Sequence, residues 1–294
     1  MTRWWAALLL ALVVVGLAAG RTVRPGSATA AAPSCAVSAG AYQPFPAEVA
    51  LALEHAAVGQ SGSGYPDLPP LRVGLTDPRV TAAAAPCVLV KAMAYLESSW
   101  RQARGVPAGA VGPALVSPSC GYGVMQITWG MRSLEGLPFP TQYRIATDYR
   151  YNIGWGVRML VDRWNATPGV LPPVGDRNPA VIENWYYAVW AYNQWTSANN
   201  PNNPDLPWPR PAYDGTQSKT DYPYQELVWG LAANPPRRNG APLWEPVPLT
   251  LPRREDVGLT PGPLALPDPV HPSVCAPPPR EHTIALPWLT RDRR

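Results

Sequence analysis

One acidic residue, Glu97, lies where a carboxyl group could serve as a proton donor. It follows Leu96 at the edge of the apolar stripe of a segment with helical periodicity, one turn from the end of that segment. Burial against Met93 and Trp100, and the partial negative charge at a helix C-terminus, both raise the pKa of such a carboxyl. An acid that is neutral at about pH 7 can protonate a leaving oxygen, as glycosidic cleavage requires. The alternative is a surface Glu paired with Arg101.

The stretch that follows Glu97 offers no second acid, because residues 98 to 134 contain neither Asp nor Glu. A glycosidase that uses two carboxylates would need the other one from elsewhere in the fold. The same stretch contains a glycine-hinged turn that presents an amide and a thioether, Gly121-Tyr122-Gly123-Val124-Met125-Gln126-Ile127. Farther on comes Ala191-Tyr192-Asn193, within another helical pattern.

In this order, the residues resemble the catalytic domain of soluble lytic transglycosylases, which belongs to the goose-type-lysozyme-like group. The family carries a Glu-Ser pair, a Gly-Leu-Met-Gln loop and an Ala-Tyr-Asn motif. The matching residues are Glu97-Ser98, Gly123-Val124-Met125-Gln126 and Ala191-Tyr192-Asn193. The weaker matches are Ser117-Pro118, Asn152-Ile153-Gly154 and Tyr222-Pro223-Tyr224, so that the ordered set covers about half of the chain.

The chain departs from the family pattern at two places. The gap from Glu97 to Gly123 is longer than usual and contains a Gly/Pro-rich insert. After Asn193 the family commonly has a small residue and a glycine, whereas this chain has Gln194-Trp195 and then a long Asn/Pro-rich excursion. These differences leave substrate length and peptide-stem preference open.

The resemblance implies a peptidoglycan lytic transglycosylase that works with a single acid. Glu97 would protonate the oxygen that links N-acetylmuramic acid to N-acetylglucosamine, while the N-acetyl group of the substrate stabilises the positive charge. The resulting carboxylate would take the proton of the C6 hydroxyl, which closes a 1,6-anhydro ring. Because no water is consumed, a second carboxylate is unnecessary. The expected partners are peptidoglycan glycan strands.

The resemblance also implies roles around the glycine-hinged turn. Ser117 would hydrogen-bond the N-acetyl group or its neighbourhood, whereas its structural alternative is a loop Ser before Pro. Met125 and Gln126 would line the cleft, with Gln126 in contact with sugar hydroxyls. Their structural alternatives are a core Met and a turn-capping Gln.

Two more residues are expected near the acid. Tyr192 would place its hydroxyl close to Glu97, orienting the carboxyl and tuning its pKa, unless it is a core Tyr. Asn193 would tie its helix to the loop.

The aromatic residues also suit sugars, because 13 Trp and 13 Tyr stand against only two Phe. A ring with a flat apolar face and a polar edge can stack on a pyranose or fill a core. The candidates for stacking are Trp129, Trp185, Trp190, Trp195 and Trp208.

Two other functions are compatible with these residues. The first is a hydrolytic muramidase with the same Glu97, which an Asp near it, such as Asp148 or Asp221, would favour. The second is a non-catalytic envelope protein that holds glycan, with the Pro-rich tail as an arm that contacts envelope components.

The elements that must position these residues are helices, and the fold class is mainly α, with a lysozyme-like helical domain implied by the resemblance. One helix is expected over residues 86–101 from its apolar spacing. A second has Asp148 as N-cap and ends at Pro168-Gly169, and a third has Asn178 as cap with Pro179 at its first position. Shorter helices are expected over residues 46–58 and 224–232.

Four regions follow along the chain. Residues 1–32 carry an apolar run behind Arg3, typical of a signal peptide or a membrane anchor. Residues 33–84 form an N-terminal extension with one helix, residues 85–232 the catalytic domain, and residues 233–294 a Pro-rich tail with polyproline character. The tail either lies on the domain or hangs free, and Trp244 or Trp288 could pin it. The expected location is secreted or in the cell envelope.

Outside the cytoplasm the four cysteines are free to pair, in any of three ways. Because Cys87 and Cys120 flank the candidate site and Cys35 and Cys275 lie in the flanks, we expect Cys87–Cys120 and Cys35–Cys275.

Composition argues against several other classes of function. Three dispersed histidines make a zinc site improbable, and no cofactor is expected. The net charge of +4 comes without a block of Lys and Arg, which argues against nucleic acid as a partner.

Overall fold

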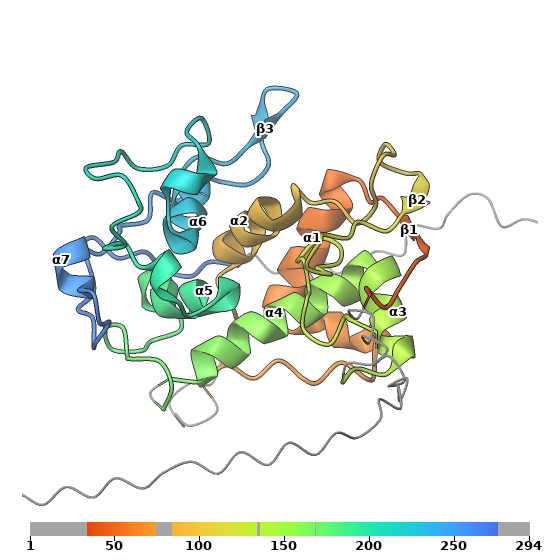
Figure 1. The fold of residues 1–294 in the computed structure, drawn as a ribbon, viewed down its shortest axis with the longest axis horizontal. Coiled ribbons are helices and arrows are strands. Elements are labelled where there is room, and N and C mark those ends of the chain that lie inside the picture. The colour runs from red at the N-terminus through yellow and green to blue at the C-terminus, as the bar shows by residue number, and fades with distance from the viewer. Residues whose placement is uncertain (1–33, 75–83, 134–135, 168, 276–294) are drawn as a thin grey trace, which may run out of the picture. The chain divides into compact units, whose positions relative to one another are not determined.

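The computed structural model of this chain describes residues 34–74, 84–133, 136–167 and 169–275 (Figure 1). The expected signal peptide or anchor, Pro168 and Trp288 lie outside the described residues. Within the described ranges, no helix is long and apolar enough to cross a membrane.

Helices dominate these ranges, which confirms the expected mainly-α class. The α-helices are α1 (Pro46–Ala57), α2 (Cys87–Ser98), α3 (Phe139–Thr147), α4 (Tyr149–Asn165), α5 (Tyr186–Asn193), α6 (Tyr224–Ala233) and α7 (Arg254–Val257). Four 3-10 segments join them: η1 (Gln60–Gly64), η2 (Ile182–Trp185), η3 (Ser197–Asn199) and η4 (Lys219–Asp221). Two short antiparallel pairs complete the set, β1 (Gly40–Tyr42) with β2 (Val111–Pro113) and β3 (Arg237–Arg238) with β4 (Ala241–Pro242).

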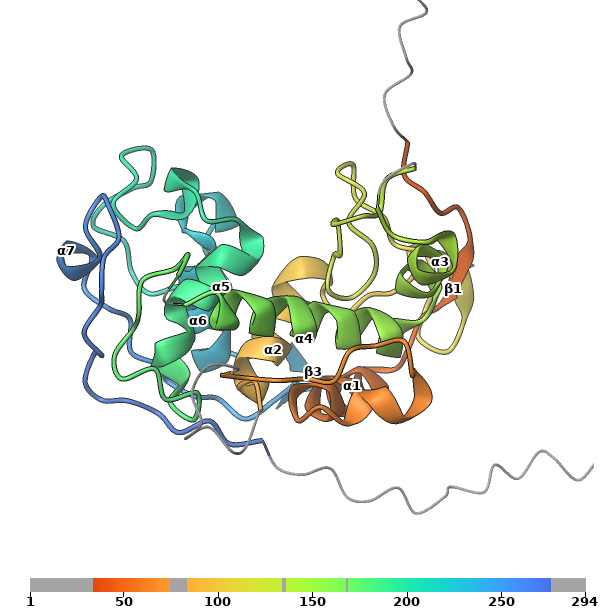
Figure 2. The ribbon, with the colours of Figure 1, turned by 90° about the horizontal axis from the view of Figure 1, so that it is seen from below.

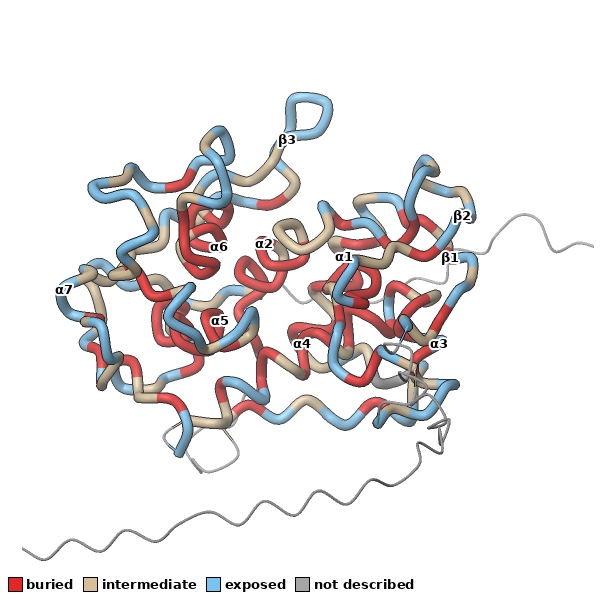
Figure 3. The backbone as a smooth tube through the Cα atoms, viewed as in Figure 1, coloured by how far each residue is buried: buried red, intermediate tan, exposed pale blue. Residues whose placement is uncertain are grey.

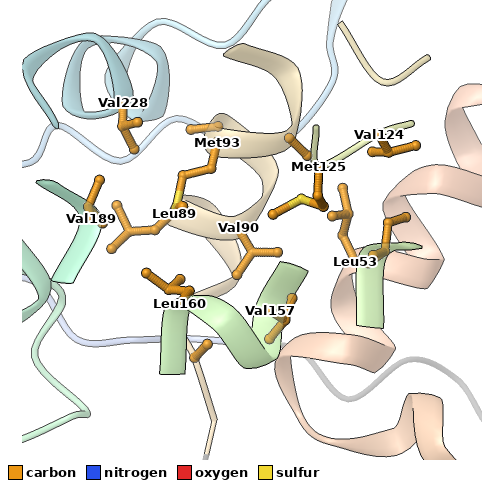
Figure 4. Close-up of a cluster of buried hydrophobic side chains, with 14 of the residues drawn as sticks. Leu53, Leu89, Val90, Met93, Val124, Met125, Val157, Leu160, Val189 and Val228 are labelled. Atoms are coloured by element: carbon orange, nitrogen blue, oxygen red, sulfur yellow. The ribbon is translucent and has the colours of Figure 1, made fainter. Parts of the chain in front are cut away.

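The core lies around α2 and α4. Helix α4 packs against α1 and α3 near one end and against α5 near the other, while α2 packs against α6 (Figure 2). Apolar side chains from α2, α4, α5 and α6 meet in one cluster (Figure 4), which includes Leu89, Val90, Met93, Val157, Leu160, Val189 and Val228. Buried residues are concentrated in the helices, and most exposed residues lie in the outer loops (Figure 3).

The ends of the helices were predicted with mixed success. Asp148 caps α4 as expected, because its side chain accepts hydrogen bonds from the backbone N–H groups of Arg150 and Tyr151. The expected start of the third helix at Asn178 is wrong. Asn178 Oδ1 accepts from the Ala180 N–H at 3.0 Å in a turn, and Val181 is extended because it pairs with Pro272 of the tail.

The predicted disulfide pairing is also wrong. The structure joins Cys35 to Cys120 and Cys87 to Cys275. The N-terminal flank runs beside the loop before α3, where Cys35 forms a bridge with Arg132, so that it meets Cys120. The end of the described tail instead reaches the first residue of α2. Two disulfides are typical of proteins that mature outside the cytoplasm.

The described part of the Pro-rich tail lies on the helices, and three contacts hold it there. Trp244 is buried against the ring of Trp100, with ring centroids 5.5 Å apart. Leu264 pairs with Val174. The buried carboxylate of Glu183 accepts from the His271 N–H at 2.9 Å and lies 2.6 Å from His271 Nδ1.

A double Cys87→Ser/Cys275→Ser variant should unfold more easily, because this disulfide closes a segment of 188 residues in the unfolded chain. We expect the free energy of unfolding to fall by about 2–5 kcal/mol, measured by urea titration. The control is peptide mapping of the parent protein without reductant, which should yield Cys35–Cys120 and Cys87–Cys275 peptides. A Cys87–Cys120 peptide would contradict the structure.

Candidate active site

Glu97 lies in the last turn of α2, half-buried beside the first residue of α6. The Tyr224 hydroxyl donates a hydrogen bond of 2.7 Å to Glu97 Oε1. Burial raises the pKa of Glu97 from its ordinary value of 4.5 to about 7, while the Tyr224 hydrogen bond and the charge of Lys219 limit the rise. Glu97 is therefore an acid that exchanges its proton near neutrality.

Helix α2 ends directly after this acid. Ser99 and Trp100 both have positive φ, at 55° and 61°. The turn is held by the Trp100 side chain, whose Nε1 donates to the Lys91 carbonyl at 3.1 Å. Because the helix stops before Arg101, the i,i+4 geometry for a helical ion pair between Glu97 and Arg101 does not form.

Ser98 connects the end of α2 to the glycine-hinged turn. Its Oγ donates to the Val124 carbonyl at 2.8 Å and accepts from the Arg101 N–H at 3.1 Å. The resemblance paired Ser98 with Glu97 without giving it a role. Its role in the structure is to hold the turn against the acid-bearing helix.

Two buried amides hold the same turn from behind. Asn152 of α4 accepts from the Met125 N–H at 2.8 Å and donates to the Tyr122 carbonyl at 2.8 Å. Gln102 accepts from the Val124 N–H at 3.1 Å. Gly123 has a φ of 66° and faces both amides, where a Cβ would clash with them. The sequence gives no signal for Gln102, which stands between two arginines, Arg101 and Arg104.

Met125 belongs to the core and does not line a cleft, which corrects the expectation from the resemblance. Its side chain is fully buried between α2 and α4 (Figure 4). It packs so closely on Gly156 that a Cβ there would lie 2.6 Å from the Met125 side chain. Its contribution to the site is its carbonyl, which accepts a hydrogen bond of 2.9 Å from the Tyr192 hydroxyl.

The hydrogen-bond partner of Glu97 is Tyr224 and not Tyr192. The two tyrosine rings stack with centroids 6.5 Å apart. Burial, and then the charge of Glu97, raises the pKa of Tyr192, so Tyr192 is a near neighbour of the acid although its hydroxyl points to Met125. From the sequence, Tyr224 was only a weak match to the family pattern and the expected first residue of a helix.

Asn193 was expected to tie α5 to the glycine-hinged turn. In the structure it instead ties α5 to the segment before α6. Its exposed Oδ1 accepts from Asn199 Nδ2 at 3.1 Å. Asn199 Oδ1 in turn accepts from the Tyr224 N–H at 3.2 Å, and its carbonyl accepts from Gln225 at 2.8 Å. Asn199, which sequence reasoning missed, therefore positions the residue that holds Glu97.

Ser117 and Gln126 lie together on either side of Gly121, both half-buried. Ser117 Oγ accepts from the Gly121 N–H at 2.9 Å. Gln126 Nε2 donates to the Gly123 carbonyl at 2.9 Å. Both side chains thus stabilise turns, which agrees with the alternatives of a loop Ser and a turn-capping Gln. Part of each side chain remains accessible.

The two aspartates that would favour hydrolysis have other contacts. Asp148 accepts from the Tyr65 hydroxyl at 2.6 Å in addition to capping α4. Asp221 accepts from Thr220 Oγ1 at 3.3 Å. Within the described ranges, no group of three His, Cys, Asp or Glu side chains is arranged to hold a metal ion.

A hollow of about 630 Å³ opens beside the end of α2. Its wall includes Tyr95 and Ser99 next to the acid, Lys219 from η4, and Asp214 and Asn234 from the segments around α6. Ser99 lies two residues after Glu97 in the chain, and the positive charge of Lys219 lowers the pKa of Glu97. Glu97, Ser117 and Gln126 are not among the residues that line this hollow, so it does not by itself provide a substrate site at the acid.

The five candidate stacking tryptophans fall into different settings. Trp185 and Trp190 are core residues, and Trp195 packs on Trp190 with ring centroids 4.3 Å apart. Trp208 is 56% exposed, with the Arg254 guanidinium 4.5 Å from its ring centroid. Trp129 is 61% exposed.

Comparison of the chain with protein-family models, with curated proteins and with solved structures finds no match in any of the three. The candidate site therefore depends on its own geometry and on the ordered motifs.

The raised pKa of Glu97 makes a prediction about stability. The folded state holds the Glu97 proton more tightly than the unfolded chain does, so this contribution to stability is complete below about pH 4.5 and is lost as the pH rises through about 7. Glu97→Gln should therefore gain about 3 kcal/mol relative to the parent between pH 4.5 and pH 8.5, measured by urea unfolding. Glu245→Gln, at an exposed position, is the control and should show no such gain.

The hydrogen bond from Tyr224 makes a second prediction. Tyr224→Phe removes a donor that favours the charged carboxylate, so the pKa of Glu97 should rise above about 7. The measurement is a ¹³C NMR titration of Glu side chains, with Glu97 assigned by its loss in Glu97→Gln. Tyr192→Phe is the matched control, since its hydroxyl donates to Met125. An equal rise in both variants would contradict the assignment of Tyr224.

Proposed function

We propose that this protein is a peptidoglycan lytic transglycosylase that cleaves the bond between N-acetylmuramic acid and N-acetylglucosamine and forms a 1,6-anhydro product. The observation that carries the proposal is the Glu97 carboxyl, with a pKa of about 7, at the junction of α2, α6 and the glycine-hinged turn. The same ordered motifs support a lysozyme-like arrangement of the goose-type group for the helical body.

The pKa suits a residue that acts first as an acid and then as a base. Near neutrality both forms of the carboxyl are populated, and each form is needed in one half of the reaction. The neutral acid protonates the glycosidic oxygen, and the carboxylate then accepts the C6 hydroxyl proton. Tyr224 stabilises the carboxylate form by donating to Oε1.

The surroundings of Glu97 favour the ring-closing outcome over hydrolysis. A water molecule that attacks the anomeric carbon needs a base, and the side chains that act on Glu97 in the described structure, Tyr224 and Lys219, include no second carboxylate. In the ring-closing reaction Glu97 itself is the base, and the N-acetyl group of the substrate stabilises the positive charge. The half-buried Ser117 and Gln126 are the side chains proposed to contact the sugar.

Digestion of purified murein tests the proposal. The parent protein should release fragments that are lighter by one water than the products of hydrolysis, as measured by mass spectrometry. Glu97→Gln should lose nearly all turnover yet still bind murein in a pull-down. Reducing-end fragments would instead show a muramidase, and unchanged turnover in Glu97→Gln would refute a catalytic role for this residue.

The pH profile supplies an independent prediction. Because the neutral form of Glu97 starts the reaction, kcat/KM should fall about tenfold per unit of pH above about 7. In Tyr224→Phe the start of this decline should move to higher pH, in step with the NMR titration. A decline that does not move with the pKa of Glu97 would assign the titration to another group.

A further inference from the structure

A second hollow, of about 300 Å³, lies on α4, and Glu97 is not among the residues that line it. Trp155, Met159 and Asp162 are spaced four and three residues apart, so they lie on one face of the helix. Trp129 joins them from the loop that follows the glycine-hinged turn, and Arg158 and Arg163 complete the polar part of the wall. The volume is at the lower end of the range for small-molecule sites, which is about 300–1,000 Å³.

The apolar part of this wall is a pair of indole rings. Trp129 is 61% exposed, which is unusual for so large an apolar side chain beside a hollow. Trp155 is half-buried and held in place by Tyr151, with ring centroids 6.1 Å apart. An indole face offers a flat apolar surface, and its N–H offers a polar edge. This combination suits a ligand that is flat and apolar on one side and polar at its rim.

Arg158 supplies an independent observation. The residue is only 8% exposed, and its guanidinium is held by the carbonyls of Pro69 and Gly154, the latter at 2.7 Å. Its Nη2 is buried without a hydrogen-bond partner in the described structure. A buried donor without an acceptor costs free energy, and such groups are rare in folded proteins. Because Arg158 also lines the hollow, a small rotation of its guanidinium would bring Nη2 to a ligand oxygen there.

The charges of the wall narrow the class of ligand. Arg158 and Arg163 are hydrogen-bond donors, and Asp162 is an acceptor beside them. A ligand hydroxyl can therefore accept a hydrogen bond from an arginine and donate one to Asp162. A strongly anionic ligand would lie against Asp162, and a purely apolar one would leave the Nη2 of Arg158 without an acceptor. A pyranose with equatorial hydroxyls presents C–H groups on its face and oxygens at its edge, which matches this wall.

We propose that this hollow is a second sugar-binding site, which takes a β-linked amino-sugar unit of a glycan strand on Trp129 and Trp155. The identification of the sugar as an N-acetylated unit of peptidoglycan rests on the proposed function. The more general class, a pyranose, follows from the residues that line the hollow. Binding at two positions on one strand raises the effective concentration of the strand at Glu97. The site therefore serves to keep the protein on its insoluble substrate.

The test follows the indole N–H signals of ¹⁵N-Trp-labelled Glu97→Gln protein during titration with a trimer of β-1,4-linked N-acetylglucosamine. Trp129 and Trp155 are assigned by the loss of their signals in Trp129→Ala and Trp155→Ala. Both signals should shift, and the dissociation constant read from Trp155 should rise about fivefold or more in Trp129→Ala. Trp208 is 56% exposed, but the Arg254 guanidinium lies over its ring in place of a sugar. It is the matched control, and neither its signal nor Trp208→Ala should respond.

Several outcomes would overturn the site. The first is that the Trp129 and Trp155 signals do not shift. The second is that the dissociation constant read from the Trp155 signal is unchanged in Trp129→Ala. The third is that Trp208→Ala weakens binding of the trimer as much as Trp129→Ala does. The murein digest separates this failure from failure of the proposed function. Cleavage of murein without a shift of the Trp129 signal would refute the second site alone. A shift of the Trp129 signal without cleavage would refute the catalytic proposal alone.

Discussion

The burial of one carboxyl group between α2 and α6 is the interaction on which the candidate site depends. Removing Glu97 from water raises its pKa to about 7, and the hydrogen bond from Tyr224 keeps the rise moderate. The two effects oppose each other, because desolvation favours the neutral acid and the phenol favours the anion. Both require α6 to pack on α2, so the chemistry of the site is a direct consequence of helix packing.

Neutral hydrogen-bonding groups hold the glycine-hinged turn and the first residue of α6 in place. Ser98, Gln102 and Asn152 bind the glycine-hinged turn from two sides, and Asn199 binds the first residue of α6. Such groups fix geometry through donor and acceptor directions without adding charge near Glu97. A charged residue in their place would change the pKa of the acid. The network therefore separates the positioning of Glu97 from the tuning of its charge.

The peripheral segments are fastened to this core by long-range links. The Cys87–Cys275 disulfide and the Glu183–His271 contact hold the Pro-rich tail against α2 and η2, and Cys35–Cys120 holds the N-terminal flank near the glycine-hinged turn. Helix α4 then has two uses. Asn152 and Gly156 support the turn, while Trp155, Met159 and Asp162 line the second hollow.

What the sequence by itself determined is local: the helical class, the Asp148 cap, and an acid at the apolar edge of a helix near its end. Periodicity, capping and the helix dipole act within a few residues, so they can be read from neighbours in the chain. Only the tertiary structure decided that Tyr224 and not Tyr192 holds Glu97, that Met125 fills the core, how the cysteines pair, and that α5 begins at Tyr186. Each of these depends on which distant segments come together, and packing, not sequence spacing, selects those partners.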